Sequence, residues 1–397
     1  MLRSEKRFLL VVPSSAGDLT GAKTNNRDMK LQTVSLDARS NREKIHSEWT
    51  GLLNRVGSGN LGHSADWFWS NIDWISPKAN RLRFVMVKQN GQLVGLFPLD
   101  NRLLRLGPLR VPSLGFIDSP YAPTDTAILL DKGQEEPVCE AFVSHLFEQI
   151  GGWRCFTMEG SSGDGRAASC LARALSRRGI VIERAEESVP LMNLSAGWKE
   201  YIESQSVNFR RGIRRAQNRL ESMGRVEYVS GVGDSALDGI ERIDKASWRM
   251  LKPKDVEKNA SVLRYCRNLH KTFPDESKHI IRFLHLDGNA VAGLYGLVYE
   301  NTFYAVKANF DARYGKGSPG LVLLVRVFEE CAEKGISKIE LFGKNEYLRR
   351  LSNHSRPLAR LLVCNRRGFG TLMGTLIKFA VRIKRSTKKA GEVTRGE

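Results

Sequence analysis

The feature that most constrains the fold of this chain is a pair of similar hairpin patterns, one in each half of the sequence. The first reads Val87-Lys-Gln-Asn-Gly-Gln-Leu-Val-Gly95 and the second reads Leu284-His-Leu-Asp-Gly-Asn-Ala-Val-Ala-Gly293. In both, apolar residues flank a turn that contains glycine, which is typical of two antiparallel strands. Helical patterns precede each hairpin, and further strands and helices follow it. The sequence therefore predicts an internal structural duplication of two α/β (α+β) halves.

We expect the two halves to occupy residues 29–188 and 189–355, with a loose tail over 1–28 and a basic C-terminal helix and tail over 356–397. In the first half the patterns predict strand and helix across 30–57, a hairpin over 82–99, a strand over 155–159, and helices over 66–74, 136–150 and 166–178. In the second half they predict helices over 198–204, 209–223, 237–250, 260–272 and 320–334, and strands over 226–230, 280–286, 290–300, 302–310 and 338–342.

Composition excludes several classes of protein. The 397 residues are 41% hydrophobic, which indicates a globular chain, and no apolar run reaches the length of a membrane-spanning helix. The six cysteines form no CxxC pair and the seven histidines no HExxH motif, so we expect free thiols, a reducing cytoplasmic compartment and no metal. The net charge of +19 predicts a polyanionic partner, which includes nucleic acid, anionic lipid, a nucleotide cofactor or a phosphorylated substrate.

The most informative segment is the glycine-rich stretch from Asp311 to Gly320, which lies between a predicted strand and a predicted helix. Such a turn presents backbone N–H groups and the positive end of the helix dipole, a combination that suits a pyrophosphate. Arg313 and Lys316 add positive charge. The alternative is a structural turn that needs glycine only for its backbone angles. Neither the dinucleotide fingerprint nor the P-loop pattern fits its spacing.

Several pieces in order resemble the GNAT-type acetyltransferases of the cellulose-biosynthesis (CelD/BcsL-like) family, relatives of the Fem peptidyltransferases. They are Phe209-Arg-Arg-Gly-Ile-Arg-Arg-Ala216, Ala246-Ser-Trp-Arg249, the second hairpin, Asn309-Phe-Asp311 with Tyr314, Ser318-Pro-Gly320, and Phe342-Gly343 followed by Tyr347. Together with the first half, the resemblance covers about residues 30–355. It departs at Glu340, Leu348 and Leu351, where family members usually have Asp, Lys and Trp.

The resemblance implies a tandem GNAT-like fold with two mixed sheets flanked by helices. It also implies a bacterial cytoplasmic enzyme that transfers an acetyl or other acyl group from acyl-CoA to an amine or hydroxyl of a cell-envelope or exopolysaccharide precursor. Gly317, Ser318 and Gly320 would bind the donor pyrophosphate, assisted by Arg313 and Lys316. The strand that ends at Asn309 would separate from 339–342 so that pantetheine lies between them.

In such a reaction the acceptor attacks the thioester directly, so the protein supplies orientation, an oxyanion donor and a path for protons. A backbone N–H near Asn309 is the candidate oxyanion donor. Glu340 and Asp311 are candidate bases; equally, Asp311 caps the turn and Glu340 is a solvated strand-end charge. Tyr347 or Tyr314 would protonate the leaving thiolate, or would serve only in packing.

Candidate substrate-binding residues are Trp248, which is also a candidate core residue, and Arg210 and Arg214 of an arginine-rich helix. Arg210, Arg211, Arg214, Arg215 and Arg219 fall on one helical face, which would either bind phosphates or be a solvated surface.

The last 42 residues carry eleven Lys or Arg against two Glu. Within them, 369–389 suits either contact with an anionic membrane at its inner face or docking on the domain. We expect a small-molecule or lipid-linked sugar as acceptor and no sequence-specific nucleic acid. A Fem-like transferase that uses aminoacyl-tRNA, and a catalytically degenerate GNAT that binds membranes or polyanions, are the alternatives.

Overall fold

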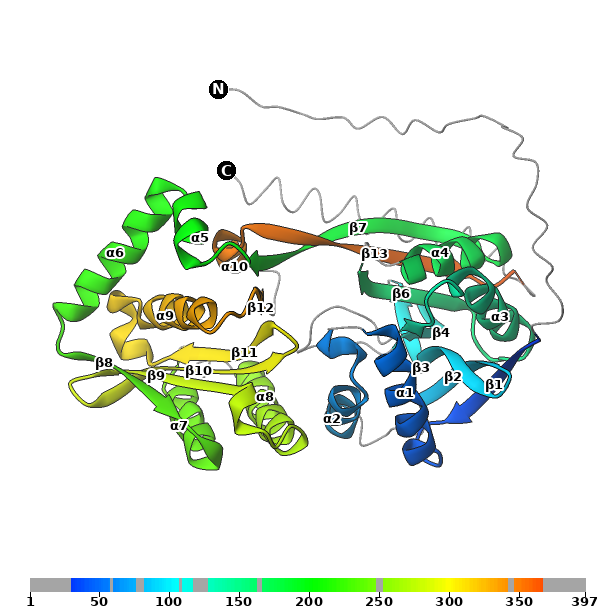
Figure 1. Ribbon diagram of the computed structural model, residues 1–397, viewed down its shortest axis with the longest axis horizontal. Coiled ribbons are helices and arrows are strands. Elements are labelled where there is room, and N and C mark those ends of the chain that lie inside the picture. The colour runs from blue at the N-terminus through cyan, green and yellow to red at the C-terminus, as the bar shows by residue number, and fades with distance from the viewer. Residues whose placement is uncertain are drawn as a thin grey trace, which may run out of the picture.

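The structure, a computed structural model, describes residues 30–57, 60–75, 82–106, 109–116, 128–162, 166–247, 253–341 and 346–366 (Figure 1). They form two lobes, one from each half of the chain, which two long strands join along one side (Figure 1). Within these ranges no helix combines the length and the apolar character that crossing a membrane requires.

The first half contains β1 (Leu31–Asp37), α1 (Arg42–Val56), α2 (Ala65–Ile75), β2 (Leu82–Gln89), β3 (Gln92–Leu106), β4 (Leu109–Phe116), β5 (Leu129–Leu130), α3 (Glu135–Glu148), β6 (Cys155–Ser162), α4 (Arg166–Arg178) and β7 (Ile180–Asn193). The second half contains α5 (Trp198–Ser204), α6 (Val207–Glu221), β8 (Val226–Gly231), α7 (Gly233–Lys245), α8 (Pro253–Thr272), β9 (His279–Leu286), β10 (Asn289–Tyr299), β11 (Thr302–Phe310), α9 (Pro319–Glu333), β12 (Lys338–Leu341), α10 (Glu346–Leu351) and β13 (His354–Cys364). Short 3₁₀ turns lie at Leu61–His63, Glu276–Lys278 and Ala312–Gly317.

The order of the strands confirms the duplication. Neighbouring strands follow the order β1-β2-β3-β4-β6-β13-β7-β12-β11-β10-β9-β8, and β5 pairs with β3 outside this order. The same sequence of strand pairings is found when the order is followed inward from either end. From either end four strands run antiparallel, and the next pairing, β4 with β6 or β11 with β12, is parallel. The order of elements matches too, since a strand, two helices, a hairpin, a strand, a helix, a strand, a helix and a final strand follow in both halves. Each half is thus a mixed sheet, as the sequence predicts.

The two mixed sheets join because the halves exchange their last strands. The end of β7, the final strand of the first half, pairs with β12 of the second half over Leu191–Asn193. Conversely β13, the final strand of the whole chain, pairs with β6 of the first half and with almost the full length of β7. The boundary predicted near residue 188 therefore falls within a strand that serves both lobes.

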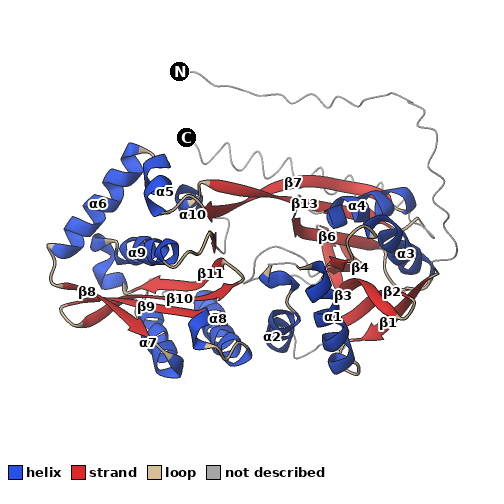
Figure 2. Cartoon of the chain, in the orientation of Figure 1, coloured by secondary structure: helices blue, strands red, loops and turns tan. Residues whose placement is uncertain are grey.

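Helices cover both faces of the second sheet. Figure 2 shows α7 and α8 on one face and α9, with α6 beside it, on the other. The core of α9 and the sheet includes Phe328, Ile339 and Phe303, all fully buried. A separate core cluster continues from the Trp-rich helix α2 into α8, where the Trp67 indole donates to the Tyr265 hydroxyl at 2.9 Å. The Tyr304 hydroxyl of β11 accepts from the Leu61 N–H at 3.1 Å. These contacts hold the lobes together.

The structure corrects two expectations about the C-terminal part of each half. Residues 356–364, expected to begin a basic helix and tail, belong to β13, and residues 180–193, for which the sequence analysis named no strand, form β7. The short apolar run at the end of β13, Leu361–Cys364, fits a strand or a helix by pattern alone; pairing on both of its edges makes it a strand. The pairing also brings Cys155 and Cys364, 209 residues apart, face to face as buried thiols.

Candidate functional site

The centre of the second lobe is the point where β11 continues beyond β12. The two strands pair in parallel only over Thr302–Ala305 and Lys338–Leu341, while β11 runs on to Phe310 with β10 on its other edge. A bulge at Val306 interrupts the pairing of β11 with β10 at this position, and bulges bend a strand and increase its twist. The backbone of β11 after Ala305 is therefore without a pairing partner in β12 over the described residues. The separation expected between Asn309 and residues 339–342 stays a prediction, because 339–341 pair with 303–305 and residues 342–345 lie outside the described residues.

A tight loop follows β11 and starts α9. Ala312–Gly317 form a 3₁₀ turn, Ser318 takes the left-handed conformation with φ of 53°, and Pro319 begins the helix. The Ser318 N–H donates to the Gly315 carbonyl at 3.1 Å, and the Leu321 N–H donates to the Ser318 carbonyl at 3.0 Å. Pro319 has no N–H, and the Gly320 N–H has no intrahelical acceptor by position, so this amide lies at the positive end of the α9 dipole.

Gly317 and Gly320 differ in how closely their neighbours pack against them. A Cβ atom on Gly317 would lie 2.8 Å from Leu220 Cδ1 and 3.0 Å from Met223 Sδ, because the end of α6 rests on the loop. A Cβ atom on Gly320 would meet only the Phe310 ring, at 3.0 Å. Gly317 thus serves the contact with α6, and Gly320 is the position where a side chain would enter the anion-binding end of α9.

Asp311 is held in the loop by its own neighbour. The carboxylate is 4% exposed, accepts the Arg313 N–H at 2.9 Å, and pairs with Arg313 Nη2 at 2.6 Å. These contacts keep the pKa of Asp311 below its ordinary value of 3.8. A general base near neutral pH needs a raised pKa, so this geometry favours the alternative role of Asp311 as the cap of the turn. The Arg313 guanidinium is therefore held by its ion pair with Asp311, and it also lies over the Tyr314 ring.

We expect the Asp311 carboxyl to titrate below pH 3.8, and its midpoint to rise toward that value in Arg313→Ala. The folded-state pKa is the lowered one, so ionised Asp311 contributes stability above the pKa of the unfolded state. That contribution is lost as the pH falls through the folded-state pKa. Carbon-13 NMR of the labelled carboxyl measures both midpoints. A midpoint above 4 in the unsubstituted protein would show that the ion pair does not form.

Beneath the loop lies a buried polar cluster that the sequence analysis did not identify. Lys307 Nζ is 2.7 Å from Asp244 Oδ1, with side-chain exposures of 3% and 2%. The Asn309 amide donates to the same oxygen at 2.5 Å, and its own oxygen accepts the Phe310 N–H at 3.1 Å. The side chain of Asn309 is therefore engaged within the protein, and its contact with an acyl donor stays a prediction. The contacts fix the end of α7 to β11 where β11 leaves β12.

The remaining predicted site residues are Glu340, Tyr347, Trp248, Arg210 and Arg214, and the structure describes the side chains of only some of them. Glu340 is half-buried on β12, opposite Tyr304 of β11 and Leu191 of β7. Tyr347 lies in α10, but its side chain is outside the described residues, and so is Trp248. Arg210 and Arg214 are exposed on α6. Their predicted roles stay predictions.

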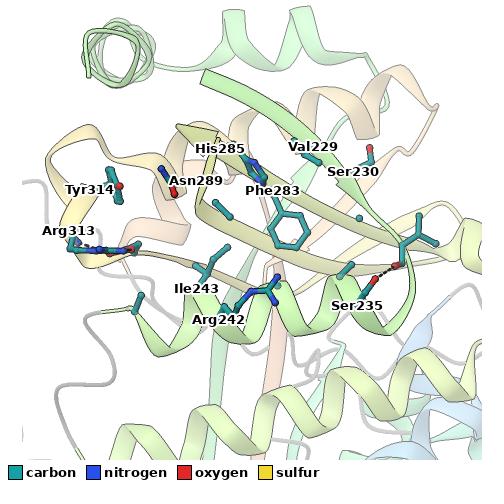
Figure 3. Close-up of a pocket in the computed structure, with 17 residues that line it drawn as sticks. Val229, Ser230, Ser235, Arg242, Ile243, Phe283, His285, Asn289, Arg313 and Tyr314 are labelled. Carbon is teal, nitrogen blue, oxygen red and sulfur yellow. Dashed lines mark hydrogen bonds and ion pairs between the residues drawn. The ribbon is translucent and has the colours of Figure 1, made fainter. Parts of the chain in front are cut away.

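A groove of about 560 Å³ opens beside the loop on the α7 face of the sheet (Figure 3). Its floor is apolar and includes Phe283 and Ile243, whereas Arg242 and His285 supply polar groups. Arg313 and Tyr314 lie at the loop side of the groove, as Figure 3 shows, and Asp311 also lines it. The groove therefore combines an apolar surface with groups that can hydrogen-bond or neutralise an anion. Sequence patterns cannot find it, because β8, α7, β9 and the loop all contribute.

Nothing in the geometry of the described residues suggests a metal centre. No three His, Cys, Asp or Glu side chains come together there as ligands of an ion would. The site thus consists of a loop at a helix N-terminus, a stretch of β11 (306–310) that has no partner in the described part of β12, a buried ion pair and a groove.

Comparisons with known proteins give one family match and several structures of similar fold. Residues 207–350 match the family model described as an acetyltransferase (GNAT) domain. Among solved structures, a conserved protein of unknown function from Bacteroides thetaiotaomicron is 14% identical with a TM-score of 0.50, over 84% of this chain and all of that one. FemX is 10% identical with a TM-score of 0.49, over 79% and 95% of the two chains. A tandem GNAT protein from the clavulanic acid biosynthesis pathway is 12% identical with a TM-score of 0.46, over 84% and 98%. No curated protein sequence matches the chain.

Within the second half, residues 207–350 are thus similar to the GNAT acetyltransferase domain. The repeated strand order extends the same kind of fold over both halves, so the chain has a tandem GNAT-like fold.

Proposed function

We propose that the protein transfers an acetyl or other acyl group from acyl-CoA to an amine or hydroxyl. The observation that carries the proposal is the placement of the loop before α9 directly after the part of β11 (306–310) whose edge has no partner in the described part of β12. A diphosphate at the Gly320 end of α9 would direct its attached chain along β11, where the backbone of an unpaired strand can hydrogen-bond an extended amide-containing chain. Pantetheine is such a chain, so one donor molecule would occupy both features.

The reaction needs no group beyond those that the lobe supplies. The acceptor nitrogen or oxygen attacks the thioester carbon, the bond from carbon to sulfur breaks, and the proton of the acceptor leaves to a base. A backbone N–H of β11 near Asn309 would stabilise the oxyanion. Of the two candidate bases we favour Glu340, because the ion pair with Arg313 lowers the pKa of Asp311 and makes it the weaker base. Tyr347 is the candidate acid for the leaving thiolate.

The acceptor is proposed to enter through the groove on the α7 face. Its apolar floor and the Arg242 guanidinium suit a molecule that carries both an apolar part and a phosphate, such as a lipid-linked sugar of the cell envelope or an exopolysaccharide precursor. The resemblance of the sequence to polysaccharide-biosynthesis acetyltransferases supports the same class. The protein would then act in the cytoplasm at the inner face of the membrane. The basic segment 369–389, expected to contact that membrane, lies outside the described residues.

Replacing Gly320 by glutamate is expected to abolish acetyl-CoA binding while the protein stays folded. The helix dipole stabilises a carboxylate in the first turn, so the variant should fold. That carboxylate would, however, occupy the anion site and repel the diphosphate. Gly320→Gln is the matched control, because it has the same size and the same contact with Phe310 without the charge. Calorimetric titration of acetyl-CoA into the three proteins measures the effect, and we expect at least a tenfold weaker affinity for the glutamate variant than for the glutamine variant.

The outcome also distinguishes the alternatives. Equal affinity of the two variants would place the donor elsewhere. If the unsubstituted protein bound aminoacyl-tRNA but not acetyl-CoA, a Fem-like transferase would replace the proposal. If it bound neither donor but bound anionic vesicles, the domain would be a binding module.

A further inference from the structure

The outer face of α6 carries a row of arginines that has no counter-charge in the described chain. Ile213, Ala216 and Leu220 form the buried face of this helix. The exposed face carries Arg210, Arg211, Arg214, Arg215 and Arg219. Across the residues that the structure describes, the side chains of the first four make no hydrogen bond or ion pair. Like charges one turn apart repel each other on a helix, so this arrangement favours an anion as the missing partner.

The chain also contains a pair of arginines with the same spacing and the opposite environment. Arg173 and Arg177 of α4 are likewise exposed and four residues apart, but they pair with Glu136 at 2.6 Å and Glu140 at 3.0 Å. The row on α6 therefore differs from an ordinary solvated face of this same protein.

The row ends at the loop before α9. The Arg219 guanidinium donates through Nη1 to the Lys316 carbonyl at 2.8 Å, and Leu220 and Met223 pack where Gly317 lacks a side chain. Arg219 is thereby fixed beside the loop, and the exposed Lys316 ammonium lies in the loop itself. Arg215 is one helical turn further along the same face, about 6 Å along the helix axis from Arg219. The positive charge thus continues from the loop onto the surface of α6.

We propose that Arg215 and Arg219 bind the phosphate on the ribose of the acyl-CoA donor, beyond the diphosphate that the loop would hold. The inference rests on the proposed function and extends its donor site. A guanidinium group binds a phosphate through two parallel hydrogen bonds, and a nucleotide whose diphosphate sits at the loop places its next phosphate within reach of this face. The arginines of α6 then select a donor that carries three phosphate groups over one that carries two.

The test compares acetyl-CoA with acetyl-dephospho-CoA, which lacks only the ribose phosphate. Calorimetry with the full chain is expected to show about 10- to 100-fold tighter binding of acetyl-CoA. In Arg215→Ala/Arg219→Ala the two donors should bind equally, at the affinity of the dephospho form. Arg173→Ala/Arg177→Ala removes the same charge at the same spacing and should keep the full preference. Circular dichroism checks that both variants are folded.

Each result has one meaning. Equal binding of the two donors by the unsubstituted protein, or an undiminished preference in the α6 variant, overturns the inference and leaves the proposed function intact. A loss of preference in both variants would mean that only net charge matters, which also overturns it. If the α6 variant kept its preference but lost affinity for tRNA, the row would serve a nucleic acid instead. Failure of the unsubstituted protein to bind either donor, or acetyl-pantetheine, overturns the proposed function as well.

Discussion

A chain that ends after Asn353 is expected to fail to fold, although among the described elements it retains every helix and twelve of the thirteen strands. The reason is the exchange of final strands between the halves. Without β13, β6 and β7 lose the partner that lies between them. The buried side chains Leu361, Leu362 and Val363 also disappear from two cores. Each contributes about 1.5–3 kcal/mol, so their loss alone approaches the total stability of about 5–15 kcal/mol that is usual for a folded protein.

The measurement is soluble yield together with urea unfolding followed by circular dichroism. Co-expression of residues 350–397 as a separate polypeptide is expected to restore a soluble, cooperatively unfolding complex, because the paired edges of β6 and β7 remain available to it. The same segment with the order of residues 354–364 scrambled is the matched control and should not restore folding. A truncated chain that unfolded cooperatively on its own, at the same urea concentration as the full chain, would show that β13 is dispensable.

The first lobe alone should fail for the same reason. Residues 30–193 include β7, whose last residues pair with β12 of the second lobe, and they lack β13 entirely. We therefore expect the two halves to unfold in a single transition, even though each repeats the complete order of elements of one domain.

Local patterns in the sequence were sufficient for the elements that flank short turns. The hairpins around Gly91 and Gly288, the helix that ends before Gly179 and the helix that begins at Pro319 are all found where alternation, glycine and proline place them. The ends of the other helices shift by a few residues: the helix expected over 237–250 is Gly233–Lys245. Such elements are set by contacts between near neighbours in the chain.

The strands β7 and β13 were not predicted because nothing local requires them. The middle of β7 contains Glu183, Glu186 and Glu187, and a proline follows at Pro190, a composition that argues against a strand in the interior of a sheet. Its partner β13 begins at His354, 161 residues after β7 ends at Asn193. No alternation of residues in either segment identifies the other as its partner. Pairing between segments this distant is a property of the whole fold.

Some residues of the site could likewise be found from local sequence patterns, whereas others come together only in the fold. The loop around Ser318 was found from its glycines, because backbone angles and a helix start are local. The pairing of Lys307 with Asp244 joins residues 63 positions apart, and a single lysine in a strand otherwise suggests an exposed side chain. The sequence likewise supplied Asp311 as a candidate base, whereas the direction of its pKa depends on the side chain of Arg313.

Replacing Lys307 by methionine is expected to destabilise the protein by about 3–5 kcal/mol, because Asp244 would remain as a buried charge without its partner. The double variant Lys307→Met/Asp244→Asn should recover most of this loss. It removes both charges and keeps an oxygen that accepts the hydrogen bond from Asn309. Lys245→Met is the matched control at the next position: Lys245 is 67% exposed in its pair with Glu241, so its loss should cost at most about 1 kcal/mol.

Urea unfolding of the four proteins measures these differences directly. Equal destabilisation by Lys307→Met and by the double variant would mean that the lysine acts through packing and not through its charge. The stability of the pair also bears on the site, because Asp244 and Asn309 connect the end of α7 to the unpaired part of β11, and the Ala312 N–H donates to the Ala246 carbonyl at 3.1 Å just beyond them. If Lys307→Met is folded at low temperature, it should bind acetyl-CoA more weakly than the double variant does, since the β11 backbone that would hold the donor is fixed by this cluster.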